Sequence, residues 1–400
     1  MIFNKNQEEV INAALGFLRN NSEQVFQFSG EAGTGKSVVL NEIINRSGLD
    51  RNRIAPMAYI GQAAIVMRTK GLYNAKTIHS WLYEAIIDFV RDENDKIVYD
   101  TYHNKPLQKL VFVPREIKDI DLFIIDEAGS VPYELKKDIE SKGKKIIACG
   151  DIRQLPPPCD RPAYLYEGKI MYLTEIMRQN KDSMILELAR RAKLGLPIPN
   201  GRWKDCMVIY EDELDDFILP SAEMIVCGKN ATREIFINKI RNMLGYTTQI
   251  PQYGEKLICR KNNWLVDVDG ISLANGLIGT VVNSPDISTF DGKTFNIDFK
   301  PDLSDNVIFN NISCDYKYFV APYDKKQQIK LDRYSTGEKF EYAYAITTHS
   351  SQGAQYRQGI YFEEYLNRDI QKNLNYTGIT RFSDYLVYVK KRPKNNFYFS

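Results

Sequence analysis

The stretch VFQFSGEAGTGKSVVLNEII, from Val25 to Ile44, contains an apolar run, a glycine-rich turn and a segment with apolar residues at helical spacing. This order predicts a strand, a loop and a helix. Its centre, from Gly30 to Ser37, fits the pattern GxxxxGK(S/T) of a phosphate-binding loop. The glycines let backbone N–H groups curl around phosphate oxygens, and the helix N-terminus adds a favourable dipole.

Two side chains of this loop are expected to act on a bound nucleotide. Lys36 would reach the outer phosphates, and the hydroxyl of Ser37 would bind Mg²⁺. The predicted nucleotide-binding residues of the loop are Gly30, Gly33, Thr34, Gly35, Lys36 and Ser37.

A second apolar run, LFIIDEAGS from Leu122 to Ser130, is typical of a strand buried in a parallel sheet and ends in two acids. Asp126 would hold the Mg²⁺ through water, and Glu127 would polarise the attacking water. Since kinases, GTPases, transporters and motors share such a site, it indicates hydrolysis or transfer of a nucleotide γ-phosphate and no more.

The composition limits the fold and the surroundings of the chain. Its 400 residues suggest two or three domains, and 44% hydrophobic and 26% charged residues are ordinary for a globular enzyme. A net charge of +2 gives no argument from bulk charge for a nucleic-acid partner. No apolar run is long enough to cross a membrane and the start is polar, so we expect a cytoplasmic location. The six cysteines are scattered without metal-ligand spacing.

Two further segments bear on the nucleotide site. KKIIACGDIRQLPPP, from Lys144 to Pro158, is another buried strand, and Asp151 and Gln154 at its tip are candidate sensors of the γ-phosphate. Gln7, in a helix-like segment ahead of the loop, is placed to read adenine through its amide, although a surface glutamine is the commoner explanation.

The motifs together carry a family resemblance. In order along the chain they are NxxQ at Asn4 to Gln7, GEAGTGKS, GQAA at Gly61 to Ala64 with TIH at Thr77 to His79, DEAGS, GDIRQLPP, LTEIMRQ at Leu173 to Gln179, NATREIFINKIR at Asn230 to Arg241, AITTHSSQG from Ala345, and YTGITR at Tyr376 to Arg381. On these motifs the chain resembles superfamily 1 helicases of the 5′-to-3′ branch, the branch of Dda-like and RecD-like helicases.

The resemblance implies an α/β fold of two RecA-like P-loop NTPase lobes with a β-hairpin (pin) insertion and an SH3-like β-barrel insertion. It implies a first lobe at 1–175 with the hairpin at about 88–118, a second lobe at 176–245 and 341–400, and the barrel at 246–340. ATP would lie in a cleft between the lobes.

The resemblance also implies residues of the second lobe that act on ATP. Arg381 would be the arginine finger and Arg178 the second arginine at the γ-phosphate, although either could instead form an ordinary salt bridge. Gly353 would contact the nucleotide. The expected catalytic set is Lys36, Glu127, Gln154, Arg178 and Arg381.

A third set of residues is expected to contact DNA. In the family, the segments that hold Gly61, Gln62, Thr77, His79, Thr348, His349 and Gln352 face the single strand. Each of the two histidines could equally be a structural residue. Three positions depart from the family pattern: Gly129, Gln62 and Gln355 stand where a larger residue, a Lys and a Glu are common.

Two insertions are visible in the sequence itself. KIVYDTY and LQKLVFV alternate in strand fashion around HNKP, within Val90 to Ile117. In similar helicases a hairpin here splits the duplex, so Tyr102 and His103 would meet the first base pair; a connecting hairpin with no role is the alternative.

Residues 245–340 offer short strands, GEKLICRKNNW, LIGTVVNS, TFNIDF and KYFVAPY, as in a small β-barrel. Trp264, Tyr316, Tyr318 and Phe319 could stack on bases, but such aromatics more often belong to the core.

The sequence therefore predicts an ATP- and Mg²⁺-dependent helicase that moves 5′ to 3′ along single-stranded DNA and unwinds duplex. A translocase that remodels protein–DNA complexes or RNA, and a nucleotide-switched DNA-binding module, are the alternatives. The expected partners are single-stranded DNA, a DNA fork, and a single-strand binding protein or replication proteins. We expect a monomer with no membrane partner.

Overall fold

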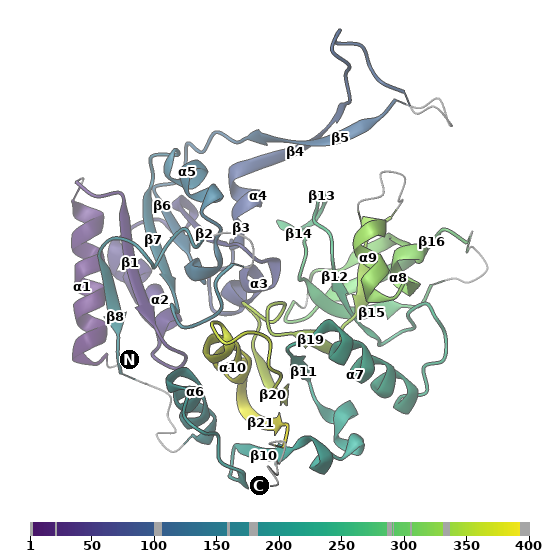
Figure 1. The fold of residues 1–400 in the computed structure, drawn as a ribbon. Helices are drawn as coiled ribbons and strands as arrows, with labels where there is room; N and C mark the ends of the chain where they lie inside the picture. Colours follow the sequence, from purple (N-terminus) through teal and green to yellow (C-terminus); the bar gives the residue numbers. More distant parts are fainter. Residues whose placement is uncertain are drawn as a thin grey trace.

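The computed structural model describes residues 3–20, 22–99, 106–157, 161–175, 183–285, 290, 292–304, 306–330 and 337–392. These residues form three main sheets and two hairpins (Figure 1). The first sheet lies in the N-terminal part of the chain, the second is built mainly from the C-terminal part, and the third lies beside both.

The first sheet is entirely parallel. In spatial order its strands are β3 (Lys76–Thr77), β2 (Ile54–Ala58), β6 (Leu122–Ile125), β7 (Lys145–Gly150), β1 (Val25–Gly30) and β8 (Ile170–Leu173). Its helices are α1 (Lys5–Arg19), α2 (Lys36–Ser47), α3 (Gly61–Thr69), α4 (Ile78–Leu82) and α5 (Glu134–Glu140), with 3-10 turns η1 (Arg51–Arg53) and η2 (Ala128–Ser130).

Helices cover both faces of this sheet, which is why its strands are continuous apolar runs. Helices α1, α2 and α3 share one apolar core with β1, while α4 and α5 share a second core with β6 and β7 on the opposite face. Because all the strands are parallel, the carboxyl ends of β1, β6 and β7 meet at one edge, where the predicted nucleotide residues follow them.

The second sheet has the same architecture with one antiparallel edge strand. Its strands are, in order, β19 (Ala345–Thr347), β11 (Met224–Cys227), β20 (Tyr356–Phe362), β21 (Phe382–Lys390), β10 (Cys206–Tyr210) and β9 (Gly201–Arg202). Its helices are α6 (Met184–Leu194), α7 (Asn230–Met243) and α10 (Gln371–Ile379), with 3-10 segments η3 (Glu211–Glu213) and η4 (Asp216–Ser221). Helices α6 and α10 pack on one face, and α7 packs on the other.

The third sheet is antiparallel and is inserted between α7 and β19. Its order is β17 (Phe309–Asp315), β16 (Thr294–Pro301), β15 (Ile278–Asn283), β12 (Lys256–Cys259) and β18 (Phe340–Tyr342). The hairpin β13 (Asn263–Val268) and β14 (Ile271–Leu273) and the helices α8 (Tyr316–Val320) and α9 (Tyr323–Lys330) complete it. Strand β18 extends across the expected boundary at residue 340, because it pairs with β12.

One strand expected in this insertion is wrong. The segment KYFVAPY lies in α8, the short turn after it and the first residue of α9. The helix begins here because Asp315 caps it by accepting the backbone N–H of Tyr318 at 2.8 Å. Tyr318 and Phe319 are buried, which places them in the core rather than on a surface that stacks bases. No segment singled out in the sequence predicts β17, the strand directly before this helix.

The hairpin of the first lobe also begins earlier than expected. Its strands are β4 (Tyr83–Phe89) and β5 (Gln108–Pro114), so the first strand follows α4 directly and KIVYDTY is not its main strand. Residues Ile97 and Tyr99 instead form isolated bridges with Arg91 and Pro106. The hairpin projects away from the sheets (Figure 1). Its expected tip residues, Tyr102 and His103, lie outside the described residues.

No helix in the described part of the chain combines the length and the apolar character that a bilayer crossing requires.

Candidate active site

The loop between β1 and α2 has the backbone that the glycine pattern predicts. Gly35 has φ of +84°, and a Cβ there would lie 2.8 Å from Nε2 of Gln7. A Cβ at Gly30 would lie 2.4 Å from Oγ1 of Thr34. The loop therefore closes tightly only because these two positions lack side chains.

Lys36 points back along this loop. Its ammonium group donates hydrogen bonds to the carbonyl oxygens of Gly30, at 2.7 Å, and Glu31, at 3.3 Å. The charge is thus held at the mouth of the loop, where an anion could replace the carbonyl oxygens. The hydroxyl of Ser37, the next residue, accepts a hydrogen bond from Nζ of Lys70 at 3.2 Å.

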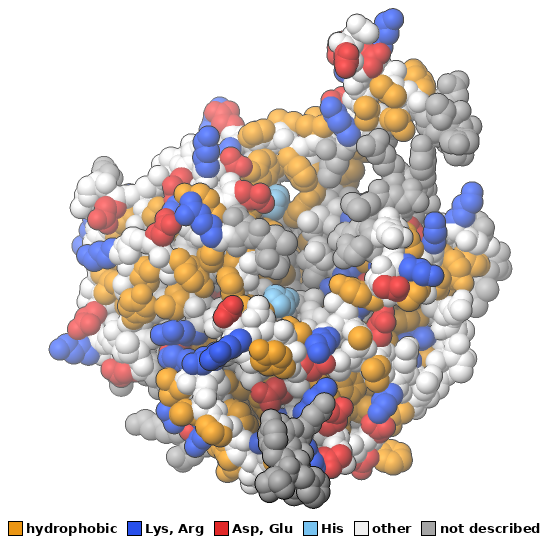
Figure 2. Space-filling model, in the orientation of Figure 1, with side chains coloured by type: hydrophobic (Ala, Val, Ile, Leu, Met, Phe, Trp, Pro, Cys, Tyr) orange, Lys and Arg blue, Asp and Glu red, His pale blue; other side chains and the backbone are white. Residues whose placement is uncertain are grey.

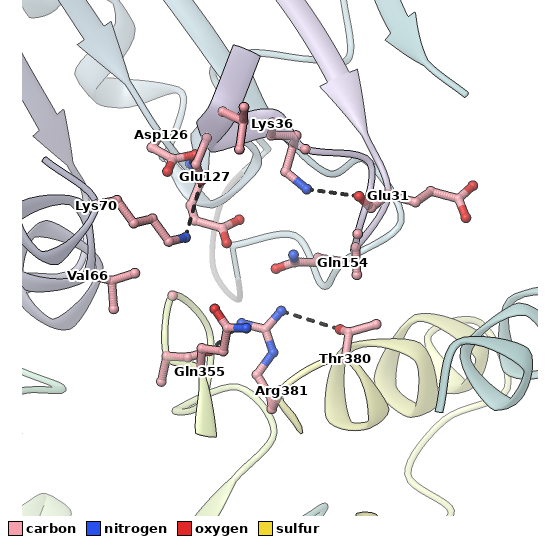
Figure 3. A pocket seen from close by; sticks show the side chains of 17 residues that line it. Glu31, Lys36, Val66, Lys70, Asp126, Glu127, Gln154, Gln355, Thr380 and Arg381 are labelled. Atoms are coloured by element: carbon pink, nitrogen blue, oxygen red, sulfur yellow. Dashed lines mark hydrogen bonds between the residues drawn. The ribbon is translucent and has the colours of Figure 1, made fainter. Parts of the chain in front are cut away.

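Asp126 and Glu127 follow β6 and face the same space (Figure 3). Glu127 has φ of 50°, a left-handed conformation that a residue with a side chain rarely adopts. Asp126 accepts hydrogen bonds from the backbone N–H of Glu127, at 2.9 Å, and from the thiol of Cys149, at 3.3 Å. Burial raises the pKa of Glu127, and the charge of Asp126 raises it further, whereas Arg381 and Lys36 act in the opposite direction.

The second lobe closes this space from the opposite side. A cleft of about 240 Å³ is lined by Lys36, Ser37, Asp126, Glu127 and Gln154 of the first lobe and by Gly353, Ala354, Gln355, Thr380 and Arg381 of the second (Figure 3). Side chains from the two ends of the sequence therefore share one cavity.

Arg381 is held firmly at the edge of the cleft. The side chain is buried and donates to the carbonyl oxygens of Ala354, at 3.0 Å, and Thr377, at 3.1 Å. Within the described part of the chain it forms no ion pair with a carboxylate, which favours the catalytic role over the salt-bridge alternative. Arg178, the other expected arginine, lies outside the described residues.

Gln7 is placed differently from the expectation. Its side chain is 3% exposed, donates to the carbonyl oxygen of Thr34 at 3.1 Å and accepts the backbone N–H of Asn4 at 3.2 Å. Both ends of the amide are therefore engaged in bracing the phosphate-binding loop, and the geometry does not favour adenine reading by this group.

A tyrosine outside the predicted catalytic set links the two lobes. The hydroxyl of Tyr376, in α10, donates to Oδ2 of Asp151 at 2.6 Å and accepts the backbone N–H of Ala32 at 3.1 Å. The neighbouring Thr377 accepts the backbone N–H of Leu155 at 3.1 Å. We call these contacts the Tyr376 latch. The sequence feature that could have drawn attention to Tyr376 is its position at the start of the motif YTGITR.

The residues expected to contact DNA fall into two groups. Thr77, Thr348, Gln352 and Gln62 are buried and hydrogen-bonded inside the protein, to Ser80, Cys227, Leu155 and Ile278 respectively. Gly61 lies against Ala274, so a Cβ there would be 3.1 Å from the Cβ of that residue. The geometry therefore favours a structural role for all five.

The two motif histidines are half-buried and keep some surface. His79 stacks on Trp264, with ring centroids 5.0 Å apart, and burial lowers the pKa of both His79 and His349. The buried Nδ1 of His79 has no hydrogen-bond partner among the described residues. A cavity of about 270 Å³ beside His79 is also lined by Lys76, Phe112, Arg115 and Trp264, between the first lobe and the insertion.

The fold and the site are those of a P-loop nucleotide-binding protein whose cleft lies between two parallel α/β lobes. Residues 3–198 match the family model described as an AAA domain. The chain is similar to the ATP-dependent DNA helicase PIF1 of Saccharomyces cerevisiae, with 27% identity over 237 residues, which cover 54% of this chain and 26% of that one. It is also similar to an uncharacterised protein of Methanocaldococcus jannaschii, with 24% identity, 96% of this chain and 38% of that one.

The fold also agrees with that of solved Pif1 structures. Bacteroides Pif1 bound to single-stranded DNA superposes with a TM-score of 0.55 and 15% identity, covering 97% of this chain and 92% of that one. The fold of two RecA-like lobes is thus confirmed, and the chain is similar to Pif1 helicases in sequence and in fold. It spans less than half the length of the two curated relatives.

Proposed function

We propose that this protein is an ATP-dependent DNA helicase that moves along single-stranded DNA, 5′ to 3′, and unwinds duplex ahead of it. The observation that carries the proposal is the shared cleft, in which Lys36 and Glu127 of one lobe face Arg381 of the other. Nucleotide hydrolysis in such a cleft requires both lobes, so it can be coupled to their relative movement.

The side chains of the cleft divide the chemistry between them. Lys36 and the loop amides would neutralise the outer phosphates, and Glu127 would orient and polarise the attacking water. Arg381 would stabilise the charge that develops in the transition state. Gln154 lines the cleft, and we propose that it responds to the γ-phosphate. Arg178 is proposed as a second arginine at the same phosphate.

The residues present fit Mg²⁺. The hydroxyl of Ser37 and the carboxylate of Asp126 line the same cleft, and Mg²⁺ is usually held by one or two such oxygens together with substrate phosphates. When bound, the ion would offset the negative charge on the phosphates.

One loop of the second lobe could transmit a change at the nucleotide to a residue that contacts DNA. It begins at Thr347, at the end of β19, and its far end, Gly353 to Gln355, lines the nucleotide cleft. His349, between these points, is half-buried and free to meet a strand on its exposed side. A movement at the γ-phosphate would therefore displace a DNA-facing residue a few positions away.

The path of the strand is proposed between the first lobe and the insertion. The face of the molecule is hollowed there, beneath the hairpin (Figure 2). Lys76 and Arg115 supply positive charge beside the aromatic rings of His79 and Trp264, a combination that suits phosphates and bases of a single strand. We propose that the hairpin β4–β5 is the wedge, with Tyr102 and His103 at its tip.

The same proposal extends to the substrate, the working form and the partners of the protein. Yeast PIF1 is named an ATP-dependent DNA helicase, and Bacteroides Pif1 was solved with single-stranded DNA. By analogy we propose a DNA fork as the substrate, with a monomer in the cytoplasm as the working form. A single-strand binding protein or replication proteins are the proposed partners.

The test is steady-state ATP hydrolysis, with and without a single-stranded oligonucleotide, together with strand displacement on forks with one 5′ or one 3′ tail. We expect stimulated hydrolysis, and displacement that requires the 5′ tail. Stimulation without displacement on DNA or RNA forks would identify a translocase. DNA binding without turnover would identify a nucleotide-controlled switch, and either result would overturn the helicase.

A further inference from the structure

Besides Lys36 and Arg381, the nucleotide cleft has another cationic side chain, that of Lys70. This residue directly follows α3, is exposed to solvent and lines the cleft on the side of the first lobe (Figure 3). Its ammonium group donates a hydrogen bond to the hydroxyl of Ser37 at 3.2 Å. None of the sequence motifs assigns Lys70 a role, so this contact needs its own explanation.

The backbone of Lys70 is fixed, so only its side chain can move. The backbone N–H of Lys70 donates to the carbonyl oxygen of Met67 at 3.2 Å and closes the end of α3. Its own carbonyl oxygen accepts a hydrogen bond from Nδ2 of Asn41 at 2.8 Å. Since Asn41 and Ser37 both belong to α2, the lysine is anchored to the helix that carries the hydroxyl. The fold thus keeps the ammonium group within reach of Ser37.

The hydroxyl of Ser37 is also the group that we propose for Mg²⁺. A hydroxyl oxygen has two lone pairs, so it can accept a hydrogen bond from an ammonium group while it binds a metal ion. The two cations would then be direct neighbours on one oxygen, and like charges repel most strongly at such short range. Binding of Mg²⁺ and the contact of Lys70 with Ser37 therefore oppose each other.

The negative charges of the cleft attract both cations. Asp126 and Glu127 line the same cleft, and Lys70 forms no ion pair with a carboxylate among the described residues. Without Mg²⁺, the ammonium group of Lys70 would offset part of the negative charge of these acids and of the nucleotide phosphates. When Mg²⁺ is bound, that charge is already offset, and the contact with Ser37 becomes unfavourable.

We propose that Lys70 competes with Mg²⁺ for the hydroxyl of Ser37 and thereby sets how strongly nucleotide binding depends on Mg²⁺. This inference rests on the proposed function for the presence of a nucleotide and Mg²⁺ in the cleft. Lys70 supports nucleotide binding when Mg²⁺ is scarce, and it reduces the gain in nucleotide affinity that Mg²⁺ provides.

The test measures the affinity for a fluorescent, non-hydrolysable ATP analogue by anisotropy, once in Mg²⁺ and once in EDTA at matched ionic strength. The dissociation constant in EDTA divided by that in Mg²⁺ is the coupling ratio between the ion and the nucleotide. Lys70→Met removes the charge and the donor and keeps the length of the side chain. We expect weaker binding in EDTA and a coupling ratio about 2- to 10-fold larger than in the wild type, the range for one hydrogen bond.

Two further variants are the controls. Lys137→Met removes an exposed charge from α5, on the opposite face of the first sheet, and should keep the wild-type ratio. Lys70→Arg keeps a charged donor at the same position and should bring the ratio back towards that of the wild type. Because both lysines are exposed, all three variants should melt close to the wild-type temperature.

Three results would overturn the inference. They are an unchanged ratio in Lys70→Met, the same change in Lys137→Met, which would show an effect of net charge, and the same change in Lys70→Arg, which would show that the charge at this position is irrelevant.

Failure of this inference is distinguishable from failure of the proposed function. Wild-type protein whose affinity for the analogue rises with Mg²⁺, together with a Lys70→Met variant that has the same coupling ratio, would remove only the competition at Ser37. Wild-type protein that does not bind the analogue in Mg²⁺ would remove the nucleotide site, and with it the helicase.

Discussion

Lys36 is the residue whose environment most directly connects the sequence pattern to the chemistry. Its ammonium group donates hydrogen bonds to two carbonyl oxygens of its own loop, so its removal takes the positive charge of Lys36 away from the loop. Without this charge, the loop would no longer attract the outer phosphates of the nucleotide as strongly.

We predict that Lys36→Ala lowers DNA-stimulated ATP hydrolysis by about a hundredfold or more, the usual effect of removing one preorganised electrostatic group. Single-strand binding should remain close to the wild type, because Lys36 lies in the nucleotide cleft. Hydrolysis is measured by phosphate release and binding by anisotropy. Turnover like that of the wild type would disprove the assignment of the site.

Arg381 belongs to the other lobe and should behave differently. We predict that Arg381→Ala leaves ATP affinity within a fewfold of the wild type, while turnover falls by about 10³-fold or more, as expected for an arginine finger. Arg381→Lys is the matched control: it keeps the charge but loses the planar fork, and should rescue little activity. A small loss of turnover with a large loss of stability would mean that the contacts to Ala354 and Thr377 are its whole role.

At the scale of elements, the Tyr376 latch is the contact that joins the lobes behind the phosphate-binding loop. One hydroxyl group holds both a carboxylate of the first lobe and a backbone N–H of that loop, and it is buried. Because Tyr376 lies in α10 and Arg381 follows shortly after that helix, a shift of α10 changes the latch and the finger together.

We predict that Tyr376→Phe weakens the coupling between the lobes. The ring keeps its packing, but Asp151 and the N–H of Ala32 lose a partner, which costs about 1–3 kcal/mol when such groups stay buried. The melting temperature should fall, and DNA should stimulate hydrolysis less than in the wild type. Tyr164→Phe, which removes a buried hydroxyl with no hydrogen-bond partner among the described residues, is the control. Equal effects in both variants would contradict a specific latch.

The elements also show what the sequence could and could not predict. Strand β1, the loop after it and α2 were predictable because each residue there serves the local geometry. The sequence predicts KYFVAPY as a short strand, but a local cap at Asp315 and the burial of Tyr318 and Phe319 make it a helix. The internal bonds of Thr348 and Gln352 depend on Cys227 and Leu155, which lie far away in the sequence, so no motif could reveal them.

At the scale of the whole molecule, ATP and DNA are expected to bind to different faces of the same two lobes. The nucleotide cleft needs Arg381 of the second lobe. The proposed strand path lies between the first lobe and the insertion, and His349 of the second lobe is proposed to meet the strand from the loop that lines the cleft. Closure of the lobes would therefore change both sites at once, and the two affinities should be linked.

The last prediction is a measure of that link. A non-hydrolysable ATP analogue with Mg²⁺ should raise or lower the affinity for a single-stranded oligonucleotide by a factor of about 5–150, the usual range of coupling between sites. By thermodynamic reciprocity, the oligonucleotide must change the affinity for the analogue by the same factor. Both are measured by titration, each in the absence and the presence of the other ligand. Tyr376→Phe should bring the factor closer to one, whereas Tyr164→Phe should leave it unchanged. A factor of one in the wild type would mean that the two lobes bind their ligands independently, and a motor built on this cleft could not then work.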